Sequence, residues 1–221
     1  MENLWKETSL KNRLLDKTSL FFLFFILFYG IQGLISLFNN IVAPPLDTFA
    51  AALIITLFFI LHLFIRFKII VPILIGIGFI PHIFGLYSLF GEGITLYGLS
   101  SLNYHYDWIV HSFGMFCYSF AFCSIIYPHL KKGLKSKFLI FILVLFFMQG
   151  LGAFNETLEY VGFDVLGYGK GFLEFGDGDS SPESGPWQNS SMDMISNLFG
   201  GVIGIGSFLL IKKRNESKQK D

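Results

Sequence analysis

The sequence predicts an all-α fold, a polytopic membrane helix bundle with six transmembrane helices and both termini in the cytoplasm. The first observation is composition: 53% of the 221 residues are hydrophobic and only 14% are charged, against about 25% charged in ordinary soluble domains. The second is that the apolar residues form six runs of about 20 residues, the length that crosses a bilayer as a helix. The third is that basic residues lie almost entirely in alternate connections between these runs.

The expected spans are defined by where each apolar run begins and ends. The first run is too long for a signal-peptide core and no small-residue cleavage site follows it, so we expect a retained span. In the third run, Pro72 fits the first helical turn, whereas Pro81 should kink the middle. Pro128 should stop the fourth span. In order, the runs are residues 19–38, 48–65, 69–90, 104–127, 138–161 and 191–211.

The distribution of Lys and Arg gives the orientation, because these residues accumulate on the cytoplasmic side. Of the 16, 15 lie in the two tails or in the connections after the second and fourth runs, and only Lys170 lies on the other side. This pattern places the loop 162–190 outside. We therefore expect one integral membrane domain over residues 1–221, in a multi-pass protein of the cell membrane surrounded by lipid bilayer.

Several functions receive no support from the sequence. The net charge is zero, which gives no reason to expect a nucleic-acid partner. No P-loop, serine elbow or redox CxxC motif is present. Gly200 and Gly204 have the GxxxG spacing that permits close helix contact, and we favour packing within the chain over dimerisation. The sequence does not otherwise specify an oligomeric state.

Three of the predicted spans carry a polar pair near the end that should face outward. Each pair is spaced i,i+3 or i,i+4, so its side chains share one helix face. Ionisable residues inside a membrane usually face the bundle interior and mark functional sites. The alternative is that they are interfacial, with the two Asp residues favoured by helix N-termini. The pairs are Asp107 and His111, Glu156 and Glu159, and Asp193 and Asn197.

The four carboxylates in these pairs have no Lys or Arg within the same spans to neutralise them. Carboxylates brought together in a partly dry site must take up protons or bind a cation. A His with several carboxylates suits Zn, Mn, Fe or Mg. We expect Asn197 and His82 to support the ligands rather than to bind the ion. The predicted metal ligands, and the catalytic residues of an enzyme, are Asp107, His111, Glu156, Glu159 and Asp193.

The same segments resemble those of known membrane families. Tyr-Asp-Trp-Ile-Val-His (106–111), Glu-Thr-Leu-Glu (156–159) and Asp-Met-Ile-Ser-Asn-Leu-Phe-Gly (193–200) look like the signature segments of the uncharacterised YjdF-like inner-membrane proteins. They also resemble the wider VanZ-like pattern Asp-x3-His, Glu-x2-Gln or Glu, Asp-x3-Asn-x2-Gly. The resemblance covers about half of the chain. In one departure, Asn189 stands where YjdF-like members tend to have an Asp.

The resemblance adds Gly200 to the functional set and implies a role at the cell envelope, because VanZ-like proteins are associated with glycopeptide-antibiotic tolerance. Three kinds of function remain. The first is a membrane enzyme whose outer-face site binds a metal or uses paired carboxylates to act on a lipid or envelope substrate. The second is a proton-coupled transporter, and the third is a non-catalytic structural or regulatory membrane protein. We favour the first, because the polar residues gather near one face and His62 alone is ionisable deep in the inner half.

Overall fold

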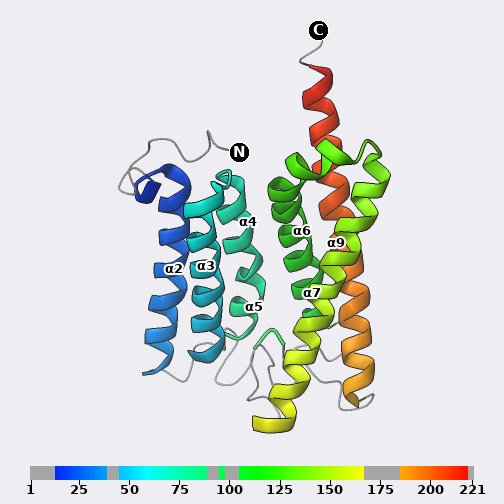
Figure 1. Cartoon of the computed structure of the whole chain (residues 1–221). Coiled ribbons are helices and arrows are strands. Elements are labelled where there is room, and N and C mark those ends of the chain that lie inside the picture. The colour runs from blue at the N-terminus through cyan, green and yellow to red at the C-terminus, as the bar shows by residue number, and fades with distance from the viewer. Residues whose placement is uncertain (1–12, 39–44, 89–94, 98–104, 167–184, 219–221) are drawn as a thin grey trace.

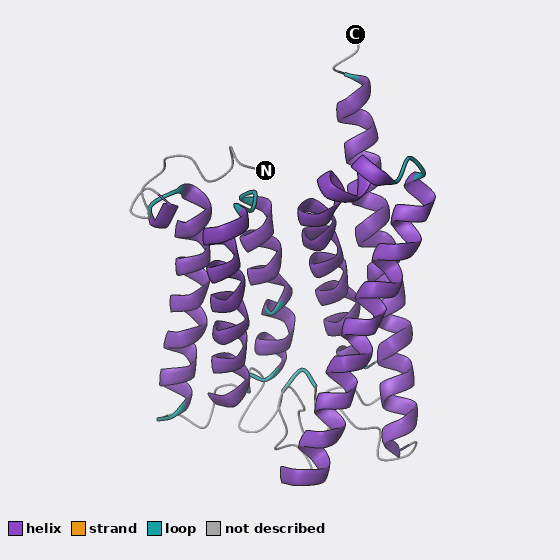
Figure 2. Ribbon diagram, viewed as in Figure 1, coloured by secondary structure: helices purple, strands orange, loops and turns teal. Residues whose placement is uncertain are grey.

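The computed structural model describes residues 13–38, 45–88, 95–97, 105–166 and 185–218. Over these residues the secondary structure is helical, without strands (Figure 2). The helices are α2 (Lys17–Ser36), α3 (Pro45–Ile65), α4 (Ile70–Gly78), α5 (Ile80–Gly85), α6 (Tyr106–Gly133), α7 (Lys137–Leu166) and α9 (Gly185–Ser217). The all-α prediction is confirmed for the described part of the chain.

Five of these helices, α2, α3, α6, α7 and α9, are long and apolar enough to cross a membrane. The remaining apolar segment, Ile70–Gly85, is shorter and is divided between α4 and α5. Large apolar side chains cover the outside of the bundle; Phe24 is 58% exposed and Phe146 is 73% exposed. A surface of this kind belongs in lipid rather than water. The chain is a multi-pass membrane protein.

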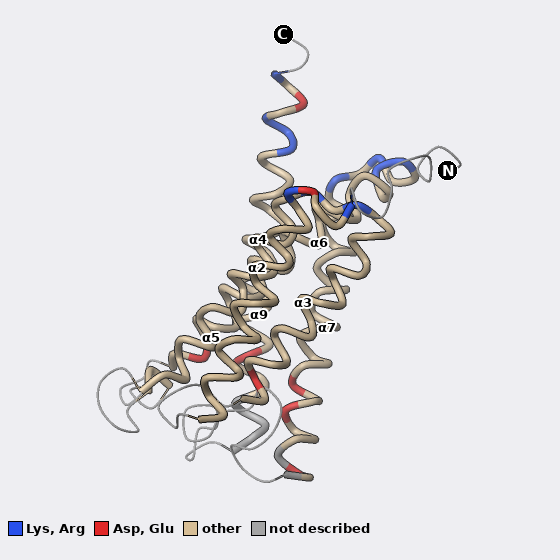
Figure 3. The backbone as a smooth tube through the Cα atoms, turned by 90° about the vertical axis from the view of Figure 1, so that its left-hand side faces the viewer, with Lys and Arg blue, Asp and Glu red and all other residues tan. Residues whose placement is uncertain are grey.

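The helices form two groups that run side by side (Figure 1). One group contains α2, α3, α4 and α5, and the other contains α6, α7 and α9. The groups are joined where α4 packs against α6. The start of α2 and the end of α9 lie at the same end of the bundle. Lys and Arg gather at this end, which we call the basic end, and most of the Asp and Glu residues lie toward the opposite, acidic end (Figure 3).

The break between α4 and α5 confirms the kink expected from Pro81. Pro81 lacks the backbone N–H that would continue the hydrogen bonds of the preceding turn; α4 ends at Gly78 and α5 begins at Ile80. Tyrosine hydroxyls bind carbonyls on both sides of the break. Tyr29 donates to the Gly76 carbonyl at 2.6 Å, and Tyr106 donates to the Pro81 carbonyl at 2.8 Å.

The contact between α6 and α9 is the most extensive in the fold. A Cβ atom added at Gly200 would lie 2.0 Å from the Ser112 carbonyl oxygen, and one at Gly204 would lie 2.5 Å from that of Phe116. Only glycine permits so close a backbone approach. The expected packing of the GxxxG segment within the chain is therefore confirmed.

Three helices extend further than the sequence indicated. Pro128 does not stop α6, which continues to Gly133; the missing N–H removes one hydrogen bond, and the next turns are not affected. The helix α7 runs to Leu166 and α9 begins at Gly185, so the loop expected over 162–190 is shorter, and its residues 167–184 lie outside the described part of the chain. A membrane helix can continue beyond its apolar segment, because water hydrates the polar side chains of the turns that extend past it.

At the basic end, His62 connects α3 with the residues that precede α2. Its Nδ1 accepts a hydrogen bond of 2.8 Å from the Phe67 backbone N–H, so the proton of the neutral ring is on Nε2. This Nε2 lies 3.4 Å from Asp16 Oδ2. Asp16 also caps α2 by accepting from the Ser19 backbone N–H at 2.7 Å. Both ring nitrogens thus have matching partners.

Candidate functional site

The three predicted polar pairs converge at the acidic end of the bundle. The pair of α6 lies in its first two turns, that of α7 toward its C-terminal end, and that of α9 near its start. The seam between α6 and α9 fixes the level at which these pairs meet, because Gly200 touches the carbonyl of Ser112, next to His111. Five of the six side chains are buried, with exposed fractions of 3% for Asp107, 6% for Glu156, 8% for Glu159, 0% for Asp193 and 3% for Asn197.

His111 is the centre of the cluster, and both of its ring nitrogens face oxygen atoms. The Nε2 atom lies 3.3 Å from Asp107 Oδ1 and 4.0 Å from Asp193 Oδ1. On the other side, Nδ1 lies 3.8 Å from Glu156 Oε1 and 3.3 Å from Asn197 Oδ1. One imidazole therefore links residues of three helices.

The cluster holds more acceptors than donors. A neutral imidazole has one N–H, whereas carboxylate or amide oxygens face both nitrogens. Both oxygens of Glu156 and Oδ2 of Asp107 are buried and accept no hydrogen bond from the described residues. Burying such groups without partners is unfavourable. The arrangement is stabilised if it takes up a cation or additional protons.

Two sets of ligand atoms have the spacing of a metal site. Asp107, His111 and Asp193 offer one set, and His111, Glu156 and Glu159 offer the other; within each set the atoms lie within 4.8 Å of one another. Ligand bonds of about 2.0–2.2 Å separate opposite ligands by roughly 4 Å, so small side-chain rotations bring either set into range. The chemistry of the donors fits a divalent ion.

His82 belongs to neither ligand set, although it lines the same cavity as Asp107 and His111. Its Nδ1 and the Tyr97 hydroxyl form a hydrogen bond of 2.8 Å, and its Nε2 lies 3.8 Å from Asp47 Oδ2. Asp47 is 1% exposed and Tyr97 is 2% exposed. Neither partner was predicted from the sequence. The available signal was an Asp in the first turn of a helix that begins with Pro45, which indicates a helix start but not burial beside a distant His.

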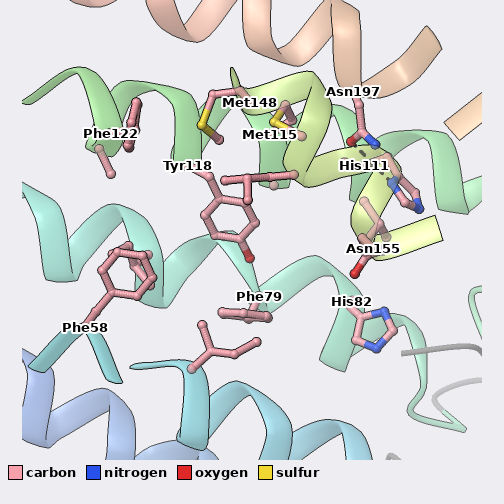
Figure 4. A pocket seen from close by; sticks show the side chains of 18 of the residues that line it. Phe58, Phe79, His82, His111, Met115, Tyr118, Phe122, Met148, Asn155 and Asn197 are labelled. Carbon is pink, nitrogen blue, oxygen red and sulfur yellow. Dashed lines mark hydrogen bonds between the residues drawn. The ribbon is translucent and has the colours of Figure 1, made fainter. Parts of the chain in front are cut away.

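A cavity of about 280 Å³ adjoins the cluster and extends between the two helix groups. In the close view of Figure 4, His82, His111, Asn155 and Asn197 lie toward one end, and Phe58 and Phe122 lie toward the other. Asp107 and Glu159 also line this space, whereas Glu156 and Asp193 do not. The cluster thus forms the polar end of a mainly apolar cavity.

Two residues marked by the family resemblance remain. Gly200 is the point of close approach between α9 and α6, which is a structural role that also positions the site. The side chain of Asn189 lies outside the described part of the chain. The assignment of the six polar side chains as functional residues is still a prediction.

Comparison with known proteins places the chain in a family. The family described as "Predicted membrane protein (DUF2238)" matches residues 18–214, a range that includes nearly all of every described helix. No curated protein and no solved structure matches the chain. The family description agrees with the apolar surface and the five long helices. The chain belongs to the DUF2238 family of predicted membrane proteins.

Proposed function

We propose that the polar cluster at the acidic end binds a divalent cation at the outer face of the membrane, and that the bound ion serves an enzyme acting on a lipid or envelope substrate. The proposal includes six membrane passes, with α4 and α5 together forming the third, and both termini in the cytoplasm. The helix directions in Figure 1 and the basic end in Figure 3 support this topology.

The observation that carries the proposal is the carboxyl group of Glu156. It is 6% exposed, and neither of its oxygens accepts a hydrogen bond from the described residues. Nδ1 of His111 is 3.8 Å from Glu156 Oε1 and itself faces Asn197. A cation between Glu156 and His111 would supply the missing positive charge to both residues.

A transporter would need polar groups that continue through the membrane. Between the cluster and the basic end, the described lining of the cavity is apolar apart from the hydroxyl of Tyr118. His62, the deep histidine of the other half, is already held by Phe67 and Asp16. These features favour a site confined to one face.

In the proposed enzyme, the protein contributes ligands, orientation and a water-poor setting. Asn197 Oδ1 lies 3.3 Å from Nδ1 of His111 and would help to orient the imidazole beside the ion. Asp107 and Glu159 face the cavity and would meet the substrate side of the ion. A divalent ion at this position acts as a Lewis acid on a substrate oxygen.

The test is metal content after purification of the full chain in mild detergent. We expect about one Zn, Mn, Fe or Mg per chain in the wild type, and an occupancy at least about tenfold lower in Asp107→Asn and Glu156→Gln. The matched control is Asp164→Asn, an exposed carboxylate on the same helix as Glu156. Asn197→Ala should lower occupancy less than either ligand variant.

Chelation provides an independent check on the same proteins. Removing the ion from the wild type should lower its melting temperature to that of Glu156→Gln, and adding the ion back should restore it. A wild type that purifies without stoichiometric metal, and whose melting temperature does not respond to any of the four ions, would show that proton sharing or an interfacial position explains the cluster.

A further inference from the structure

We propose that the cavity binds a single-chain amphiphile with a positively charged, amine-type head, whose hydrocarbon chain lies between the two helix groups. The head would lie at the acidic end, beside Asp107 and Glu159. This inference rests on the proposed function, because the positive head would neutralise the negative charge that the carboxylates of the cluster retain after one divalent ion is bound.

The shape of the cavity fits one extended chain. Along α6 the lining residues recur every three or four positions from Asp107 to Ile125, which forms one continuous stripe on the helix. These 18 steps correspond to roughly 27 Å along the helix axis. A cavity of about 280 Å³ distributed over that length is narrow, and it accommodates one hydrocarbon chain rather than two.

The walls of the cavity have the chemistry of a chain-binding site. Its deep end is formed by Phe58 of α3 with Phe122 and Ile125 of α6, and Met148 of α7 lies between this end and the cluster (Figure 4). Flexible Met and aromatic side chains adapt to an alkyl chain. Ligand pockets of this kind are mainly apolar, with a few polar groups that set the orientation.

The cavity is also accessible from the lipid side. The wall from α3 and the wall from α7 do not pack extensively against each other. Leu151 lines the cavity and is nevertheless 47% exposed on the outside of the bundle. An amphiphile in the bilayer therefore has a lateral route into the space between these helices.

The negative charge at the polar end of the cavity favours an amphiphile with a positively charged head group. Asp107 and Glu159 line the cavity, and no Lys or Arg does so among the described residues. The cluster holds four carboxylates, so one divalent ion leaves two negative charges when His111 is neutral. A phosphate head would add like charge in a site of low dielectric, whereas an ammonium head is attracted.

The experiment uses three photoreactive probes with the same octadecyl chain, which when extended approaches the length of the cavity, and a diazirine at its far end. One probe has an amine head, one a phosphate head and one a hydroxyl head, and all are irradiated with the purified full chain in mild detergent. Peptide mass spectrometry locates the label. We expect the amine probe to label the segments around Phe58 and Ile125 at least about threefold more than the other two probes.

Matched variants test whether the label reports the cavity. Ile54 lines it, whereas its neighbour Leu53 is 59% exposed on the same helix. Ile54→Trp should reduce deep-end labelling at least about threefold, and Leu53→Trp should leave it unchanged. Ile125→Trp provides a second blocked cavity if Ile54→Trp does not fold. The metal content of a blocked variant should equal that of the wild type.

Three outcomes would overturn the proposal. Equal loss of labelling in Ile54→Trp and Leu53→Trp would exclude the cavity as the chain site. Labelling confined to outward residues such as Leu57 would do the same. Deep-end labelling by the phosphate probe at the level of the amine probe would show that the head is assigned wrongly. A metal-free protein with the expected amine labelling would refute the proposed function and leave chain binding in place.

Discussion

Two histidines, His62 at the basic end of the bundle and His111 at the acidic end, differ in the hydrogen-bonding groups that surround them. At the basic end, His62 has one nitrogen that accepts from a backbone N–H and one that faces a single carboxylate. At the acidic end, His111 has oxygens on both sides, from Asp107, Glu156 and Asn197 among others. The two nitrogens of His62 therefore face one donor and one acceptor, whereas both nitrogens of His111 face acceptors.

The difference separates a structural polar group from a candidate functional one. Asp16, the partner of His62, has a side chain that is 41% exposed, so water completes its hydrogen bonds. The side chains of Asp107 and Glu156 are only 4% and 7% exposed, and water has little access to them. Burial of a His or an Asp by itself does not indicate function; an excess of buried acceptors does.

The largest expected effect concerns the side of the membrane on which each end lies. In a background in which Cys117 and Cys123 are replaced by Ala, Val165→Cys near the end of α7 should react with an impermeant thiol reagent in intact cells. Lys135→Cys, in the exposed connection at the basic end, should react only after lysis. The reverse pattern would show that the protein has the opposite orientation in the membrane. Labelling of both positions in intact cells would contradict the six-pass topology.

The next effect contrasts the two histidines directly. His111→Ala should weaken metal binding by at least about 100-fold, because it removes a proposed ligand, and titration calorimetry measures this loss. His62→Ala should leave metal affinity unchanged but lower stability by about 1–3 kcal/mol, since the Phe67 N–H loses its acceptor. Equal losses of metal affinity in the two variants would remove the distinction between these sites.

A third prediction concerns the seam that holds the acidic end together. Gly204→Ala should destabilise the protein by about 1–3 kcal/mol, because its Cβ would meet a backbone carbonyl of α6. Gly206→Ala, two residues further along α9, has open space and should be neutral or slightly stabilising. Thermal unfolding in detergent compares the two variants. Similar melting temperatures in the two variants would mean that α6 and α9 can move apart at little cost to make room for the added methyl group.

The smallest effect is expected at the basic end, where Asp16 contacts His62. Asp16→Ala should cost about 1 kcal/mol through loss of the helix cap, whereas Asp16→Asn keeps the cap and should cost less than about 0.5 kcal/mol. Thermal unfolding and metal content are measured together for both variants. A change in metal content in either variant would show that the two ends are coupled, which the comparison does not predict.

Much of the site was predictable because helical spacing is a local property. The spacing of Asp107 and His111 gives a shared face without knowledge of the fold, and the length of each span gives the depth. The partners of His82 were not predictable, because Asp47 and Tyr97 come from distant parts of the chain. The continuation of α6 through Pro128 was missed because one absent hydrogen bond was taken to end a helix that packing maintains.

The position of α9 along the chain determines when the whole polar cluster can assemble. This helix is the last of those described, and it carries Asp193 and Asn197 to the other ligands. During synthesis, α6 and α7 enter the membrane first and bring Asp107 and Glu156 there before α9 arrives. The set of Asp107, His111 and Asp193 is therefore complete only after α9 has inserted, whereas His111, Glu156 and Glu159 all lie on α6 and α7 and can meet before it.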